Sequence, residues 1–174
     1  FSLAGARLEA VATDEHGILP DALADAIVAH HPKFVYLIPT FQNPTGRSMP
    51  ADRRQAVADV LLRTGVPLLE DDPYGELRFD GDAAPPLASL PGMSAQTILL
   101  NSASKVMAPG VRIGWLRAEG DILRSLEVAK QAVGLQSAVT DQLAVARYLS
   151  TCDLDAHIAR VVAVYRERRD AMAA

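Results

Sequence analysis

The sequence of 174 residues has a single cysteine, Cys152, and lacks any apolar run long enough to cross a bilayer. One cysteine excludes an internal disulfide, so we expect a reducing location, the cytoplasm. The missing apolar run excludes a membrane-spanning helix, and the chain shows no charged-then-apolar leader with a cleavage site. We therefore expect no membrane partner.

A strong excess of one charge is also absent. The net charge is −4 at pH 7 with both signs mixed along the chain, so we expect no nucleic-acid partner for this segment. The spacing of the four histidines matches no metal-ligand pattern: His16, His30, His31 and His157. We therefore expect no metal site among them.

What is present is an ordinary globular composition, 49% apolar and 22% charged, on a chain long enough for one domain with a hydrophobic core. The first residue is Phe1 rather than methionine, and the last residues lie in the middle of a helical pattern. We expect an internal piece of a longer protein.

Strand-like and helix-like patterns alternate along the chain. Residue alternation, or β-branched and aromatic content, predicts strands at residues 7–12, 33–38, 66–70, 96–100 and 112–116. Apolar residues at helical spacing predict helices at residues 20–30, 50–64, 121–133, 137–149 and about 154–171. This order predicts an α/β layer architecture with a mainly parallel sheet. The last strand follows too short a connection for a parallel crossover, so we expect it to run antiparallel.

Two stretches are interpreted as surface. Residues 80–91, with their pair of prolines, predict a surface excursion, and the basic run Arg166, Arg168 and Arg169 predicts a solvated helix face. Ligands of α/β sheets bind beyond the carboxyl ends of the strands. The unusual residues that follow three of the predicted strands are therefore the candidates for chemistry.

The first candidate is the loop after residues 33–38, which reads Gln-Asn-Pro-Thr-Gly at positions 42–46. A residue before proline avoids the helical region and Gly46 permits a sharp turn, so a tight turn is one interpretation. The other interpretation places the side-chain amide of Asn43 at the mouth of the sheet as a donor to a ligand oxygen. Both remain open at this point.

The second candidate is the acidic run that closes the strand at residues 66–70. Glu70, Asp71 and Asp72 are adjacent, and like charges this close repel each other unless something compensates them. A solvated loop, a divalent metal site and a carboxylate paired with a protonated ring nitrogen are the alternatives. The sequence alone does not choose among them.

The third candidate follows residues 96–100 and contains Ser102, Ser104, Lys105 and Arg112. Two hydroxyls, an ammonium and a guanidinium suit a phosphate monoester, which arginine grips with a bidentate fork. Apolar residues follow Lys105, so we expect its amine to be partly desolvated and a usable nucleophile. A surface lysine beside a turn is the simpler alternative.

Together these segments resemble the fold-type-I, class I/II pyridoxal-phosphate (PLP) aminotransferases over essentially the whole chain. Four motifs carry the resemblance: QNPTG at 42–46, EDDPY at 70–74, SASK at 102–105 and PGVRIGW at 109–115. Their spelling is closest to the 2-aminoadipate and aromatic aminotransferase branch. The resemblance implies a three-layer α/β fold, with a mostly parallel sheet and one antiparallel strand. It implies a partial PLP-binding large domain at residues 1–150 and, at residues 151–174, a helix that leads toward a missing small C-terminal domain.

The resemblance also implies an activity and three catalytic residues. Amino transfer between an amino acid and a 2-oxo acid, with 2-oxoglutarate as the expected acceptor, would proceed through an internal aldimine on Lys105. Asp71, rather than Asp72, would pair with the pyridine nitrogen of the cofactor and keep it protonated. Tyr74 would be the third catalytic residue, beside Lys105 and Asp71.

The remaining implied contacts bind the cofactor. Asn43 and Tyr74 would hydrogen-bond its phenolic oxygen, and Ser102, Ser104 and Arg112 would bind its phosphate. The family also implies a homodimer. Because relatives are more than twice as long and carry further site residues, we expect the 174-residue piece to be inactive alone.

Two other functions compete with this interpretation. The same core senses ligand in PLP-binding transcription regulators that carry a winged-helix domain, but those usually depart from QNPTG, which is intact here. A metal-dependent phosphotransferase using Glu70, Asp71 and Asp72 would leave Lys105 and Asn43 without roles. The sequence favours the aminotransferase.

Overall fold

The computed structural model describes residues 2–174, which fold as two compact units. Unit 1 comprises Phe1–Glu70 and Ala84–Ile98, and unit 2 comprises Asp71–Ala83 and Leu99–Ala174. Within residues 2–174, none of the helices combines the length and the hydrophobicity that crossing a bilayer requires.

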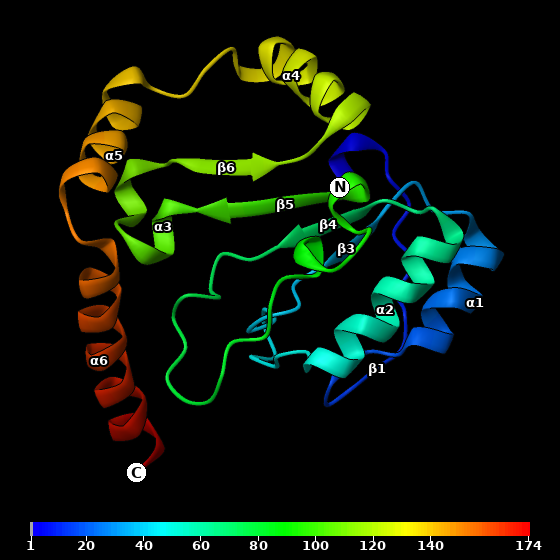
Figure 1. Cartoon of the computed structure of the whole chain (residues 1–174), viewed down its shortest axis with the longest axis horizontal. Coiled ribbons are helices and arrows are strands. Elements are labelled where there is room, and N and C mark those ends of the chain that lie inside the picture. The colour runs from blue at the N-terminus through cyan, green and yellow to red at the C-terminus, as the bar shows by residue number, and fades with distance from the viewer. Residues whose placement is uncertain (1) are drawn as a thin grey trace. The chain divides into compact units, whose positions relative to one another are not determined.

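Unit 1 contains two short antiparallel strands, a parallel strand pair and two helices that lie side by side (Figure 1). Its elements are η1 (Ser2–Ala4), β1 (Thr13–Asp14), β2 (Gly17–Ile18), α1 (Pro20–His30), β3 (Val35–Leu37), α2 (Ala51–Thr64), β4 (Leu68–Asp71), η2 (Leu87–Ser89) and η3 (Ser94–Gln96). Strand β3 pairs with β4 in parallel, with Val35 opposite Leu68 and Leu37 opposite Glu70. Asp71, the last residue of β4, already belongs to unit 2.

The two helices of unit 1 begin and end where the sequence predicts. Pro20 occupies the first turn of α1, where its missing N–H costs nothing. Gly65 follows α2 in the left-handed conformation, with φ of 67°, and its N–H bonds the carbonyl of Leu61. Both helices turn an apolar face inward, and with β3 and β4 they enclose the core: Ile18, Leu23, Ile27, Val35, Met49, Val57, Ala58, Val60, Leu61, Leu68, Leu87 and Met93.

Unit 2 contains an antiparallel strand pair and three longer helices. Its elements are most of β5 (Thr97–Ser102), then α3 (Ala103–Val106), η4 (Pro109–Val111), β6 (Gly114–Arg117), α4 (Gly120–Gly134), α5 (Val139–Thr151) and α6 (Leu154–Ala173). Strands β5 and β6 run antiparallel side by side (Figure 1), with Leu100 opposite Leu116 and Ser102 opposite Gly114. The N–H of Asp72 donates to the carbonyl of Leu100 at 3.0 Å.

Strand β3 pairs with β4 in parallel and β5 pairs with β6 antiparallel, so the predicted α/β class with both kinds of pairing and an antiparallel β6 is confirmed. One predicted strand is wrong. Residues 7–12 form no strand, and the nearest pairing is the two-residue ladder of β1 with β2. Alternation alone does not make a strand without a partner that bonds its backbone.

The predicted surface excursion at residues 80–91 is only half right. Residues 80–83 are exposed, but Leu87 and Ala88 are 0% and 3% exposed and Leu87 belongs to the core of unit 1. They enter that core as the 3-10 helix η2, whose first N–H groups need acceptors. The acceptor is the carboxylate of Glu70, described below.

Candidate active site

The loop at residues 39–49 in unit 1 is the tight turn that the sequence predicts. The N–H of Gln42 donates to the carbonyl of Arg47 at 2.8 Å, and the Asn43–Pro44 peptide bond is cis. Gly46 has φ of 71°, a conformation that other residues adopt at a cost. Asn43 is exposed at the tip, so the turn leaves its amide accessible.

The acidic side chains at positions 70–72 do not converge on one site. Glu70 is fully buried, and its Oε1 and Oε2 accept the N–H groups of Leu87 and Ala88, each at 2.8 Å. Successive residues of a strand point to opposite faces, so Asp71 faces away from Glu70. Among residues 2–174, no three acidic, histidine or cysteine side chains gather as a metal site would require. The two bonds from Glu70 cap the first turn of η2.

The serine, lysine and arginine of the third candidate come together in unit 2. Oγ of Ser102 accepts the N–H of Ser104 at 3.1 Å and so caps α3. Nη1 of Arg112 contacts Oγ of Ser104 at 3.5 Å and the carbonyl of Pro109 at 3.4 Å. Both contacts are long and use one nitrogen, so the exposed guanidinium keeps donor capacity for a further acceptor.

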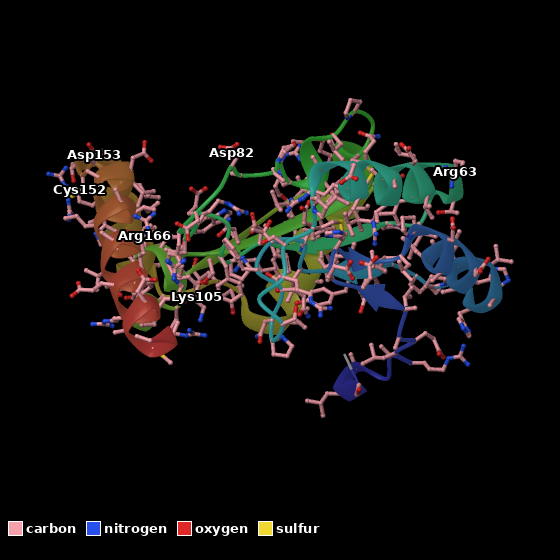
Figure 2. All side chains as sticks on the ribbon, turned by 90° about the horizontal axis from the view of Figure 1, so that it is seen from below. Arg63, Asp82, Lys105, Cys152, Asp153 and Arg166 are labelled. Atoms are coloured by element: carbon pink, nitrogen blue, oxygen red, sulfur yellow. The ribbon has the colours of Figure 1, made fainter. Side chains whose placement is uncertain are left out.

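Lys105 lies beside the aromatic ring of the acidic motif. Its Nζ is 5.7 Å from the centroid of the Tyr74 ring, which is cation–π range. The expected partial desolvation of Lys105 is wrong, because its side chain is exposed (Figure 2). Helix α3 turns Ala103 and Val106 inward, at 0% and 7% exposure, and this directs Lys105 outward.

The groups gathered in unit 2 fit PLP by their chemistry. A phosphate monoester needs hydroxyl and guanidinium donors: in the contacts above the hydroxyls of Ser102 and Ser104 accept, and Arg112 donates through Nη1 alone. An aldehyde needs an accessible primary amine, which Lys105 supplies. Asn43 belongs to unit 1, whereas Asp71 and Tyr74 belong to unit 2 with the phosphate-binding candidates.

Comparison with known proteins decides the family. The family description "Aminotransferase class I and II" matches residues 1–174. The chain belongs to this family. It is 41% identical to the aromatic-amino-acid aminotransferase 1 of Thermococcus litoralis, over 80% of this chain and 33% of that protein. The crystal structure of LysN, the alpha-aminoadipate aminotransferase of Thermus thermophilus, is 35% identical with a TM-score of 0.91, over 98% of this chain and 44% of that one.

Regulators are also among the relatives of this class I/II aminotransferase chain. It is 31% identical to the HTH-type transcriptional regulator YisV of Bacillus subtilis, over 98% of this chain and 35% of that protein. The chain thus spans less than half the length of each of these relatives. The LysN structure contains a phosphopyridoxyl-leucine adduct, and the cofactor of the family is PLP, as the motifs predicted.

Sequence reasoning missed one contact near the acidic motif of this aminotransferase chain. The run of arginines on α6 was predicted to be a solvated face, but Arg169 binds the carboxylate of Asp80 at 2.5 Å and lies 5.1 Å above the ring of Phe79. Arg166, labelled in Figure 2, donates to the carbonyl of Phe79. The hydrogen bond from Arg169 lowers the pKa of Asp80 below its ordinary value. Helix α6 is therefore fastened to the loop that follows Tyr74.

Proposed function

We propose that this chain is the cofactor-binding core of a PLP-dependent aminotransferase that moves an amino group from an amino acid to a 2-oxo acid, with 2-oxoglutarate as acceptor. The observation that carries the proposal is the grouping in unit 2 of an accessible lysine beside Tyr74 with two serines and an arginine suited to phosphate. The family match supports the same activity. PLP supplies an aldehyde that captures amines and a ring that accepts electrons.

Lys105 and Asp71 have the central roles in the proposal. The amine of Lys105 holds the cofactor covalently and, once released by substrate, carries a proton between substrate Cα and cofactor C4′. The carboxylate of Asp71 keeps the pyridine nitrogen protonated, which stabilises the negative charge that develops at Cα. Asp71 is half-buried, where water weakens such an interaction less than at an exposed position.

Binding and orientation fall to the other candidates. We assign Ser102, Ser104 and Arg112 to the phosphate, whose two negative charges the guanidinium offsets. Tyr74 and Asn43 are assigned as donors to the phenolic oxygen, and the centroid of the Tyr74 ring also lies 5.7 Å from Nζ of Lys105. These roles rest on the motif positions and on the donor chemistry.

The proposal extends to the whole protein. The family resemblance supports a homodimer and a large domain at residues 1–150, with residues 151–174 leading toward a smaller domain. The single cysteine supports a cytoplasmic location. A ligand-sensing regulator is the less favoured alternative, because the chain is 41% identical to a named aminotransferase and 31% identical to a regulator.

Borohydride reduction of the PLP-loaded protein, followed by peptide mapping, tests the proposal. The chain has three lysines, Lys33, Lys105 and Lys130, and we expect the pyridoxyl label on Lys105 alone. Label on either of the others refutes the assignment. A panel of amino donors with 2-oxoglutarate then separates the enzyme, which turns over, from a regulator, which binds without turnover.

A further inference from the structure

Arg54 is a charged residue in the core of unit 1 for which the proposed chemistry has no use. It lies on α2 and is 1% exposed. Its guanidinium makes four hydrogen bonds to oxygen atoms: Nε to the carbonyl of Met49 at 2.9 Å, Nη1 to that of Pro85 at 2.9 Å, and Nη2 to the carbonyl of Pro39 at 3.1 Å and to Oγ1 of Thr40 at 2.8 Å. A buried cation costs several kcal/mol unless it is satisfied in this way.

Three of these bonds close the neck of one loop. Pro39 and Thr40 lie at its start and Met49 at its end, and the N–H of Met49 also donates to the carbonyl of Pro39 at 2.8 Å. The guanidinium of Arg54 bridges both ends with rigid, planar geometry. Everything between them, including Asn43, is exposed or half-buried. The tip that carries Asn43 is thus joined to the core of unit 1 through this neck.

The fourth bond connects the neck to a second buried charge. Arg54 binds the carbonyl of Pro85, and the carboxylate of Glu70 accepts the N–H groups of Leu87 and Ala88. A buried cation and a buried anion thus hold neighbouring residues of one segment, at Pro85 and at Leu87 and Ala88. The loop neck is anchored to β4 through this segment and does not depend on the exposed tip.

We propose that Arg54 is a positioning residue, which acts on the cofactor through Asn43 by fixing the neck of the loop at residues 39–49. This inference rests on the proposed function, in which Asn43 donates to the phenolic oxygen of PLP. Lysine at position 54 keeps the charge but replaces the planar fork by a single ammonium with three donors. With three donors, the ammonium cannot make the four hydrogen bonds that the guanidinium makes.

The test is a double-mutant cycle of Arg54→Lys and Asn43→Ala in the full-length PLP-loaded protein. One readout is the dissociation constant of PLP, and the other is the pH midpoint of the cofactor's visible absorbance. Losing the Asn43 donor leaves more charge on the phenolic oxygen, which holds the adjacent proton more tightly and raises the midpoint. We expect Arg54→Lys to shift the midpoint the same way and weaken PLP binding roughly threefold to tenfold, the range of one hydrogen bond.

The decisive comparison is non-additivity. In the Asn43→Ala background, Arg54→Lys should change the dissociation constant of PLP less than about twofold and leave the pH midpoint nearly unshifted. The reason is that a residue that acts through Asn43 has nothing left to position. Thr40→Val is a second probe that removes one acceptor and leaves Arg54 in place, and its effect should be smaller and in the same direction. Arg63→Lys is the matched control, because Arg63 is exposed near the other end of α2 (Figure 2).

Three results overturn the inference, and they are distinguishable. If Asn43→Ala alters both readouts but neither Arg54→Lys nor Thr40→Val does, or if Arg54→Lys keeps its full effect without Asn43, Arg54 does not act through Asn43. If Asn43→Ala itself alters neither readout, the role proposed for Asn43 fails as well. The lysine label, which depends on Lys105 alone, separates that failure from a failure of the proposed activity.

Discussion

Replacing Glu70 by glutamine should destabilise unit 1 although it changes one atom. The carboxylate is fully buried and both of its oxygens accept a backbone N–H, from Leu87 and from Ala88. In Glu70→Gln one of these oxygens becomes an NH2 group, so one backbone N–H faces a donor. The first turn of η2 then loses half of its cap.

The size of the effect follows from those two bonds. A hydrogen bond to a charged group stabilises by about 1.5–3 kcal/mol, and a buried N–H left without an acceptor costs about 1–3 kcal/mol. The smaller desolvation cost of a neutral side chain offsets part of this. We expect a net loss of about 2–4 kcal/mol. At roughly 2–4 °C per kcal/mol for a chain of this size, the melting temperature should fall by about 5–15 °C.

Thermal unfolding measures the total, and amide hydrogen exchange localises it. Protection should fall first at the amides of Leu87 and Ala88, because their bonds are the ones broken. Glu15→Gln is the matched control, since Glu15 is an exposed carboxylate of the same unit and should change stability by less than about 0.5 kcal/mol. Unchanged protection at both amides, with an unchanged melting temperature, would refute the reasoning.

Two further predictions concern unit 2. Asp71→Asn should retain bound PLP but lower kcat by roughly 100-fold, about 2.7 kcal/mol of transition-state stabilisation, while Asp72→Asn is much milder; equal effects in steady-state assays would show that the wrong acid was chosen. Asp80→Asn should lower the melting temperature at neutral pH, because the carboxylate binds Arg169 and its pKa is lowered in the fold. This contribution is fully present above the unfolded pKa of about 3.9 and is lost as pH falls through the lower folded value. The stabilisation by this ion pair should also shrink in 1 M salt. A melting-temperature difference between Asp80→Asn and wild type that changes with neither pH nor salt would contradict the prediction.

The helices were predictable because their signals are local. Pro20 and Gly65 mark ends that depend only on backbone conformation, and the structure places α1 and α2 within one residue of the predicted bounds. Strand lengths were not, because a strand exists only where a partner lies opposite. Residues 33–38 shrink to three paired residues, and residues 7–12 form no strand, although the carbonyl of Ala12 accepts the N–H of Leu19.

The site shows the same division. Lys105 and Tyr74 lie together in unit 2, as expected for residues that follow the ends of predicted strands. The contact of Asp80 with Arg169 joins positions 89 residues apart, and no local pattern reveals such a pair. The burial of Arg54 was predictable but was missed. Arg54 shares the helical spacing of Val57, Ala58 and Leu61, so the sequence places it on the buried face of α2 despite its charge.

The chain passes between its two units three times, after Glu70, after Ala83 and after Ile98. Any single break in the polypeptide therefore leaves at least one unit without part of its own sequence. Removing the residues before Asp71 keeps both segments of the lysine-bearing unit, but the 15 residues of the other unit that separate Asp71–Ala83 from the rest remain between them. Excising residues 84–98 and joining the flanking segments with a linker would make unit 2 continuous, and excising residues 71–83 would do the same for unit 1.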